Sequence, residues 1–339
     1  MRLDELGWSD DFARGFSALA ASADVQTARV GIQFNHIYRV YVEQGEFDAT
    51  LSGQFKHHAE RRSELPAVGD WVAVRKRPDE HQGAIVAVLP RRSHFSRKSA
   101  GNVTAEQVVA ANIDVVFNVM ALDADFSLRR LERYLLMARE SGADPVVLLT
   151  KPDVCDDVAA RLAGVEGMAS GAPVHVISPK FNQGIEVVAA YLAPRRTGAL
   201  LGSSGVGKTT IINRLAGDEA RKTREVRGAD SKGRHTTTHR ELVVLPSGGL
   251  IIDTPGMREL QLWEAGDAVQ ETFEDVDALA PQCHFTDCRH RDEPRCAVKA
   301  AVDEGTLLPD RLASYRRLQD ELDLLRRNRR ERDWDPRNR

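Results

Sequence analysis

The chain has 339 residues, a length that fits two or three domains of ordinary size. Hydrophobic residues make up 42% of it and charged residues 29%, which excludes a collagen-like, mucin-like or wholly disordered chain. No apolar run approaches the ~20 residues that cross a bilayer, the acidic N-terminus is unlike a secretory signal, and four cysteines are too few for a disulfide scaffold. We therefore expect a soluble, cytoplasmic protein with no membrane partner.

The formal net charge is −3, so the total charge does not indicate a nucleic-acid binder. Basic residues nevertheless gather in the segments 91–98, 221–234 and 316–332. Each segment can be a solvated face or a surface for a phosphate backbone, and the sequence leaves both interpretations open.

The N-terminal part of the chain is predicted to be a small β-barrel. Residues 1–24 are predicted to form a short amphipathic helix and a linker. Within residues 25–98, five short apolar stretches separated by turn residues predict strands at 29–32, 37–42, 48–51, 70–74 and 83–89. Five strands in so short a segment fit an OB-fold, which either binds oligonucleotides or serves as a structural appendage. The aromatic rings that could stack on bases or fill the core are His36, Tyr38, Tyr41 and Phe55.

A different pattern begins at about residue 105. Apolar strands are predicted at 115–120, 146–150, 174–178 and 199–201, with helical stretches such as 128–139 between them. This alternation predicts a parallel sheet covered on both faces. A hairpin at 242–245 and 250–253 extends the sheet, and from about residue 270 the pattern is helical, with a long Arg-rich helix from 307.

A phosphate-binding loop lies between the strand 199–201 and the next helix. It matches G-x4-G-K-[ST] in full. Its backbone N–H groups and the helix N-terminus favour phosphate. Lys208 can reach the β- and γ-phosphates, and Thr209 can bind Mg²⁺. The residues predicted to bind the nucleotide here are Gly202, Ser203, Ser204, Gly205, Val206, Gly207, Lys208, Thr209 and Thr210.

A second motif, Asp253-Thr254-Pro255-Gly256, ends an apolar strand. An Asp in this position holds Mg²⁺ through water, and Gly256 lets a backbone N–H approach the γ-phosphate. Asp253 and Thr209 are therefore the predicted magnesium-binding residues, with Lys208 completing this part of the catalytic machinery.

The base-recognition motif is Thr150-Lys151-Pro152-Asp153, which follows a predicted buried strand. The Asp153 carboxylate can accept hydrogen bonds from both donors of guanine, a pair that adenine does not have, so GTP and GDP are the expected ligands. Here the chain resembles the GTPase superfamily, whose base motif is [NT]KxD, and Ser178 stands where that superfamily has a second base-contacting loop. The base motif precedes the phosphate loop, the reverse of the usual order. We therefore expect a circularly permuted GTPase domain.

A Cys/His cluster interrupts the helical C-terminal region. Cys283, Cys288, His290 and Cys296 have spacings that suit a closed tetrahedral site for one structural Zn²⁺. His284 is a rival to His290, although a ligand adjacent to Cys283 is sterically less convenient.

The complete arrangement resembles the RsgA family of circularly permuted GTPases over nearly the whole chain. The resemblance rests on the motifs above, on residues 233–238 and on Glu293-Pro294. It implies an α/β P-loop GTPase domain, preceded by an OB-fold barrel that binds ribosomal RNA and followed by a zinc-binding helical domain. It also implies GTP hydrolysis stimulated by the 30S subunit and a role in late maturation of that subunit, with its 16S rRNA as partner. We also expect a monomer. The expected boundaries are 1–24, 25–98, 105–265 and 270–339.

The residue that orients the attacking water is less plain. Many GTPases place a Gln after the DxxG motif, but here the position holds Met257, which cannot orient water. We therefore expect slow intrinsic turnover and select His235, in the candidate switch I segment 233–238, as the positioning group. Any of Thr236, Thr237 and Thr238 can meet the metal. Two rival classes are a P-loop ATPase or kinase, and an RNA-binding protein with a degenerate nucleotide site.

Overall fold

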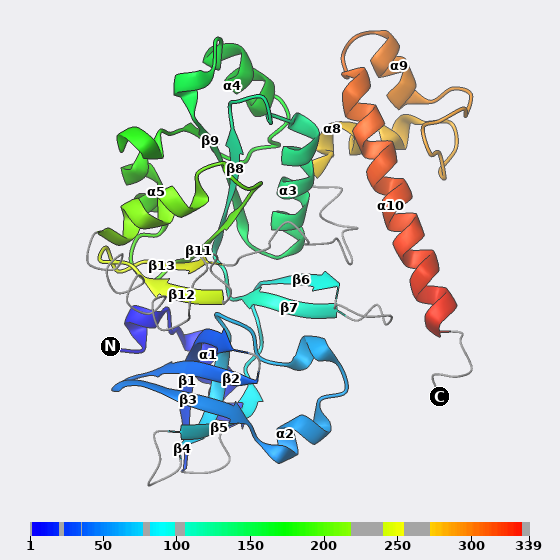
Figure 1. Ribbon diagram of the computed structural model, residues 1–339. Helices are drawn as coiled ribbons and strands as arrows, with labels where there is room; N and C mark the ends of the chain where they lie inside the picture. Colours follow the sequence, from blue (N-terminus) through cyan, green and yellow to red (C-terminus); the bar gives the residue numbers. More distant parts are fainter. Residues whose placement is uncertain are drawn as a thin grey trace.

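The first strands of the chain close into a barrel at one end of the molecule (Figure 1). The computed structural model describes residues 2–19, 24–34, 36–76, 82–98, 106–217, 240–253 and 272–333. The barrel strands are β1 (Val25–Phe34), β2 (Ile37–Val42), β3 (Gly45–Leu51), β4 (Trp71–Lys76) and β5 (Gln82–Val88). They pair in the order β1-β2-β3-β5-β4, and β4 returns to β1 and closes the barrel. This five-stranded barrel confirms the predicted OB-like domain.

The barrel core consists of inward-facing apolar side chains, among them Val30, Val40 and Ile85. Tyr38 and Tyr41 are 3% and 5% exposed, so the interpretation of these two rings as stacking platforms is wrong. Tyr38 lies in the barrel core, whereas Tyr41 packs in the neighbouring cluster with Leu6 and Trp71. His36 is exposed and Phe55 is half-buried. Helix α2 (Gly53–His58) and the 3-10 turn at Arg62–Glu64 join β3 to β4.

The central sheet carries the GTPase-like part of the chain. Its elements are β8 (Val115–Ala121), α3 (Leu128–Glu140), β9 (Asp144–Thr150), α4 (Val158–Glu166), β10 (Val174–Val176), α5 (Ile185–Tyr191), β11 (Thr197–Leu201), a helix at 208–217, β12 (Arg240–Val244) and β13 (Leu250–Asp253). The order is β10-β9-β8-β11-β13-β12, and all neighbours are parallel except β12 and β13. The predicted strands and hairpin are all present, with ends that differ by at most two residues.

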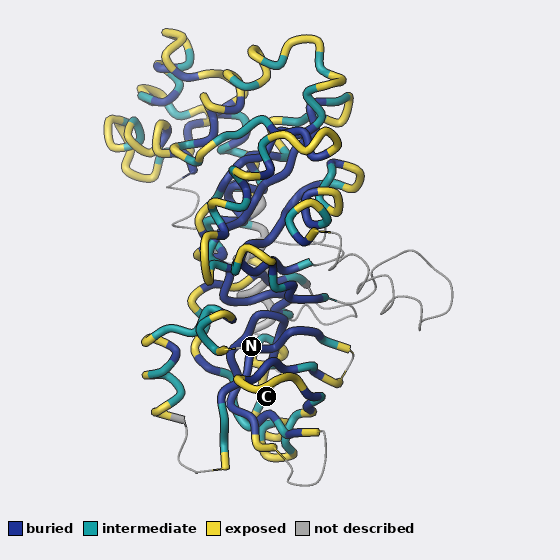
Figure 2. The backbone as a smooth tube through the Cα atoms, turned by 90° about the vertical axis from the view of Figure 1, so that its left-hand side faces the viewer, coloured by how far each residue is buried: buried dark blue, intermediate teal, exposed yellow. Residues whose placement is uncertain are grey.

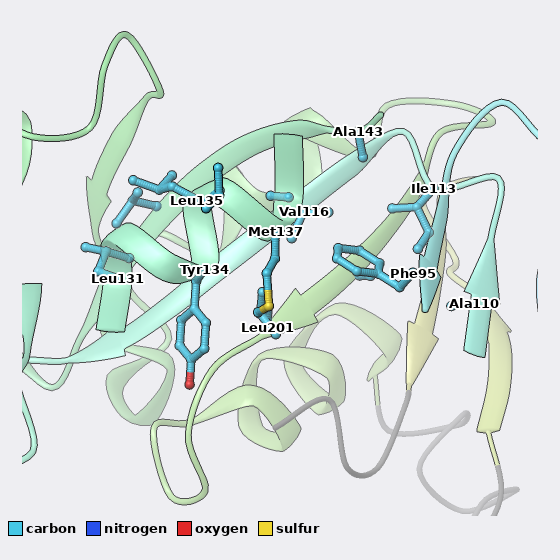
Figure 3. Packing of buried hydrophobic residues seen from close by; sticks show 14 of the residues in the cluster. Phe95, Ala110, Ile113, Val116, Leu131, Tyr134, Leu135, Met137, Ala143 and Leu201 are labelled. Carbon is cyan, nitrogen blue, oxygen red and sulfur yellow. The ribbon is translucent and has the colours of Figure 1, made fainter. Parts of the chain in front are cut away.

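Alternation along β8 separates two cores. Val116 and Met120 belong to the cluster on the α3 side, where Leu131 and Leu135 of α3 are fully buried (Figure 3). Val115, Phe117 and Val119 belong to the cluster on the opposite side. Because both faces are covered, the strands are apolar throughout rather than alternating, which is the pattern of a buried parallel sheet.

The barrel and the central sheet form a single eleven-stranded sheet, which the sequence did not predict. Strand β1 pairs antiparallel with β12, with Ile32 opposite Glu241 and Gln33 opposite Arg240. A second unpredicted feature is the hairpin of β6 (His94–Lys98) and β7 (Glu106–Ala111), which lies at this junction (Figure 1). Strand β6 falls in the segment 91–98, which the sequence marked as basic, and β7 falls where no strand was predicted.

A buried arginine fastens the junction. Arg29 of β1 is 1% exposed, and its guanidinium donates to the carbonyls of Gly69 (3.2 Å) and Asn112 (3.2 Å), to the Thr197 hydroxyl (2.9 Å) and to the Leu6 carbonyl. Burial lowers the pKa of Arg29 to about 10, so the group stays charged at neutral pH. One side chain therefore connects the N-terminal segment, the barrel, the linker to β8 and the strand that leads into the phosphate loop.

The backbone at Gly69 lies so close to β7 that the position requires a glycine. Gly69 has φ +92°, and a Cβ there would lie 2.2 Å from the Ala111 carbonyl oxygen. The short helix α1 (Asp10–Leu19) covers the same region: it buries Phe12 and lies beside Trp71 of the barrel. The short amphipathic helix predicted within residues 1–24 is thus present, at Asp10–Leu19.

The C-terminal module docks on α3 through a second buried arginine. It comprises α8 (Glu274–Asp277), α9 (Ala297–Asp303) and the long α10 (Pro309–Asp333), which begins two residues after the predicted start. Arg311 of α10 donates to Glu132 of α3 at 2.7 Å, and both side chains are less than 10% exposed. It also pairs with Asp275 at 2.8 Å and lies over the Phe273 ring. The buried cluster that includes α3 extends into this module. Along the backbone, buried stretches run through the middle of the molecule, and exposed stretches lie mainly on its outside (Figure 2).

Among the described residues, no helix combines the length and apolar composition that crossing a bilayer requires.

We predict that Arg29→Met lowers the free energy of unfolding by about 2–4 kcal/mol, because several buried oxygens lose a charged donor. Arg39→Met is the matched control on the barrel surface, where a partly exposed Arg39 pairs with Asp48; its loss should stay below about 1 kcal/mol. Urea unfolding of the three proteins measures both values. Equal small losses would contradict a special role for Arg29.

Candidate nucleotide-binding site and metal centre

The phosphate loop follows β11 at the carboxyl end of the central sheet. Gly202 lies so close to β8 that a Cβ there would approach the Val119 carbonyl oxygen to 2.4 Å, and Gly207 has φ +105°. Thr209 and Thr210 open the helix at 208–217 and are exposed. A loop that turns its backbone toward an open helix N-terminus is the arrangement that binds phosphate oxygens.

The Lys208 ammonium lies over its own loop. Its Nζ donates to the carbonyl oxygens of Gly202 (2.7 Å) and Ser203 (2.6 Å). Arg130 of α3 donates to the Ser203 hydroxyl at 2.9 Å, so α3 supports the phosphate loop. The sequence analysis missed Arg130, because nothing in its surroundings forms a local motif.

The base motif and the phosphate loop are tied together by a buried hydroxyl. Thr150 is fully buried, and its Oγ1 donates to the Val206 carbonyl at 2.6 Å. Its neighbour Lys151, in a left-handed conformation, donates to Asp123 at 2.8 Å. Lys151 lowers the pKa of that carboxyl by hydrogen bonding. Asp123 was also missed, although its place just after β8 was a usable signal.

The two predicted base-contacting loops meet at the ends of β9 and β10. Asp153 lies in the 3-10 turn Pro152–Val154, and its Oδ2 accepts from Lys180 Nζ at 3.3 Å. Ser178 is 2% exposed, and its hydroxyl has no hydrogen-bond partner among the residues that the structure describes. Arg214 of the helix at 208–217 donates to the carbonyls of Pro179 (3.1 Å) and Lys180 (3.3 Å). The base loops and the phosphate loop therefore form one connected unit.

Asp253 is the last residue of β13, which pairs in parallel with β11, the strand that leads into the phosphate loop. The rest of the predicted catalytic group lies outside the described residues: this applies to Gly256, Met257, His235 and the threonines at 236–238.

The four predicted metal ligands converge. The ligand atoms of Cys283, Cys288, His290 and Cys296 all lie within 4.8 Å of one another. Cys283 Sγ lies 3.8 Å from Cys296 Sγ, and His290 Nδ1 lies 3.5 and 3.4 Å from these two sulfurs. These separations suit a tetrahedral ion with bonds of roughly 2.3 Å to sulfur and 2.0 Å to nitrogen. His284 is exposed and is not part of the cluster.

Backbone interactions shape the loop that carries these ligands. The Glu293 carboxylate accepts from the N–H groups of Arg289 (2.9 Å) and Arg291 (2.6 Å), and backbone hydrogen bonding lowers its pKa to about 2. His290 has φ +57°. The charge on Glu293 thus holds the chain on both sides of His290.

The fold and the loops define a circularly permuted P-loop GTPase with a barrel before it and a Cys/His module after it. The RsgA GTPase family model matches residues 88–263. A relative from Opitutus terrae, named small ribosomal subunit biogenesis GTPase RsgA, is 50% identical over 95% of this chain and 90% of its own length. The chain therefore belongs to the RsgA family of GTPases, enzymes that hydrolyse GTP.

Two solved structures have the same fold. The crystal structure of YjeQ from Thermotoga maritima has a TM-score of 0.64 and 27% identity, with coverage of 89% of this chain and 99% of that one. YloQ, described as a circularly permuted GTPase, has a TM-score of 0.62 and 23% identity over 91% of this chain and 98% of its own. Both share the fold of this chain over most of its length.

We predict that Thr150→Val weakens GDP binding about ten-fold, since one buried hydrogen bond between the base loop and the phosphate loop is lost. Thr150→Ser keeps the hydroxyl and should bind nearly as the wild type does. Titration with a fluorescent GDP analogue compares the two. Equal affinities for Thr150→Val and Thr150→Ser would show that this hydrogen bond does not organise the site.

Proposed function

We propose that this GTPase acts in the biogenesis of the small ribosomal subunit. It binds the 30S particle and its 16S rRNA, hydrolyses GTP to GDP and phosphate with stimulation by the particle, and assists late maturation. The name of the Opitutus terrae relative supports this role. We further propose that the protein works in the cytoplasm as a monomer.

The observation that carries the nucleotide part of this proposal is the connection of the base loop to the phosphate loop. Thr150 ties the segment that carries Asp153 to the phosphate loop. Arg214 ties the loop at 178–181, whose Lys180 contacts Asp153, to the helix that follows the phosphate loop. A carboxylate so placed selects guanine, which argues against an ATPase or kinase. The proposed nucleotide contacts are Thr150, Lys151, Pro152, Asp153, Ser178, Gly202, Ser203, Ser204, Gly205, Val206, Gly207, Lys208, Thr209, Thr210 and Gly256.

Mg²⁺ supplies charge neutralisation between the β- and γ-phosphates when it is bound with the nucleotide. We propose that Thr209 and, through water, Asp253 hold it. Lys208 turns from its loop carbonyls to the phosphate oxygens. His235 accepts a hydrogen bond from the attacking water as neutral imidazole.

The joint between barrel and sheet supplies a route for stimulation. The segment 218–239, which contains the candidate switch I, leads directly into β12, and β12 pairs with β1 of the barrel. An RNA that shifts the barrel would act on the strand that follows switch I. We therefore propose an rRNA-binding barrel at 25–98, a GTPase domain at 105–265 and a zinc-binding helical domain at 270–339, after an N-terminal segment at 1–24.

The metal of the Cys/His module is proposed to be one structural Zn²⁺. Three thiolates and one imidazole in tetrahedral separation fill every position of such an ion, so no open position is left for catalysis.

The decisive experiment measures GTP turnover with and without isolated 30S subunits. Stimulation by the particle is expected in the wild type. Asp153→Asn should lose GTP binding and gain xanthosine triphosphate binding, because an amide can donate to the extra carbonyl of that base. If 30S subunits do not change GTP turnover by the wild type, the proposed partner is wrong. If Asp153→Asn keeps the base preference of the wild type, Asp153 does not recognise the base.

Removal of the metal tests the zinc assignment. The purified wild type should contain about one Zn²⁺ per chain, and Cys288→Ser should lose it while it keeps GTP binding. Cys155→Ser changes a cysteine outside the cluster and serves as the control. Elemental analysis gives the metal content, and freshly prepared wild type without zinc would exclude this ion.

A further inference from the structure

An aromatic side chain stands exposed beside the proposed guanine-reading carboxylate. Phe181 ends the 3-10 turn Pro179–Phe181 and is 55% exposed, among the most exposed large apolar side chains of the described residues. Exposure of so much apolar surface lowers stability, and neither the fold nor the assigned nucleotide contacts use this ring.

The ring and the carboxylate share one cation. Lys180 Nζ lies 3.3 Å from Asp153 Oδ2 and, at the same time, 4.8 Å from the centroid of the Phe181 ring, over its face. An ammonium is a compact group of N–H donors. The Lys180 ammonium thus marks a position from which an N–H group can donate to the Asp153 carboxylate while the group that carries it lies against the face of the Phe181 ring.

The loop that presents the ring is held in place. Ser178 and Gln183 exchange backbone hydrogen bonds of 2.9 and 3.0 Å. The Arg214 guanidinium ties the carbonyls of Pro179 and Lys180 to the helix that follows the phosphate loop. Phe181 therefore has a fixed backbone position relative to the phosphate loop, which keeps the entropy cost of a contact with the base low.

We propose that Phe181 is a further nucleotide-contacting residue, whose ring packs on the face of the guanine while the donor edge of the base meets Asp153. The inference rests on the proposed role of Asp153. The base displaces the Lys180 ammonium from the space between the carboxylate and the ring. The guanine edge provides N–H donors to Asp153, and its π-face replaces the cation on the ring. Asp153 then selects the base, and Phe181 adds affinity for any purine held there.

The test compares GDP affinities of the full chain by calorimetry. Phe181→Ala should weaken GDP and GTP binding equally, on the order of ten-fold, the usual effect of losing one aromatic–base stack. Phe181→Tyr should bind as the wild type does, and Phe181→Leu should fall between. In the Asp153→Asn background, Phe181→Ala should weaken xanthosine diphosphate binding by the same factor. Phe285→Ala, an exposed ring in the metal-cluster loop, is the control and should change nothing.

The outcomes separate the two proposals. Unchanged GDP affinity in Phe181→Ala, or full affinity in Phe181→Leu, would overturn the stacking contact, as would an equal loss in Phe285→Ala. If the wild type binds ADP as tightly as GDP, the proposed reading of guanine by Asp153 is wrong, whatever Phe181 does. A GDP preference that survives together with a ten-fold loss in Phe181→Ala supports both.

Discussion

The pairing of β1 with β12 is the contact on which the arrangement of the molecule depends. Without β1, the edge of the central sheet would present unpaired N–H and C=O groups, which favour association with other chains. The barrel covers this edge within the same molecule. Two residue pairs make a short ladder, and the buried Arg29 reinforces it with bonds to three other segments. In the chain, β12 immediately follows the segment 218–239, which contains the candidate switch I, so the barrel pairs with the strand next to that segment.

Helix α3 has the corresponding position on the other side. Arg130, near its beginning, supports the phosphate loop through Ser203, and Glu132 lies two residues farther along and holds Arg311 of the C-terminal module. Because the Glu132–Arg311 pair is buried, removal of one partner would leave an uncompensated charge, so the module is held in one orientation. The phosphate loop therefore contacts a helix that also carries the metal-binding module. The barrel, the GTPase sheet and the module are thus connected by named side chains as well as by chain continuity.

Circular permutation changes the order of the loops but not their meeting place. The strands β9, β10, β11 and β13 all end on the same side of the sheet, at its carboxyl end. The loops that follow them, with Asp153, Ser178, Gly202 and Asp253, therefore gather there whatever their order in the chain. Two cross-connections stabilise this end of the sheet: Thr150 joins the base loop to Val206, and Arg214 joins the helix after the phosphate loop to the loop at 178–181. The Lys180 ammonium above Asp153 and Phe181 belongs to the same surface.

Local spacing by itself determined the elements that carry the chemistry. The Gly-rich loop between a strand and a helix, the TKPD tetrapeptide after a buried strand and the Cys/His spacing were all readable, because short motifs impose their chemistry within a few residues. The strands of the barrel and of the sheet followed from their apolar pattern. Tertiary structure alone decided the β1–β12 joint, the β6–β7 hairpin and the burial of Tyr38 and Tyr41. It also decided the roles of Arg29, Asp123 and Arg130. Arg29 and Thr197 are 168 residues apart, and the value of their contact depends on burial and on partners that no local pattern specifies.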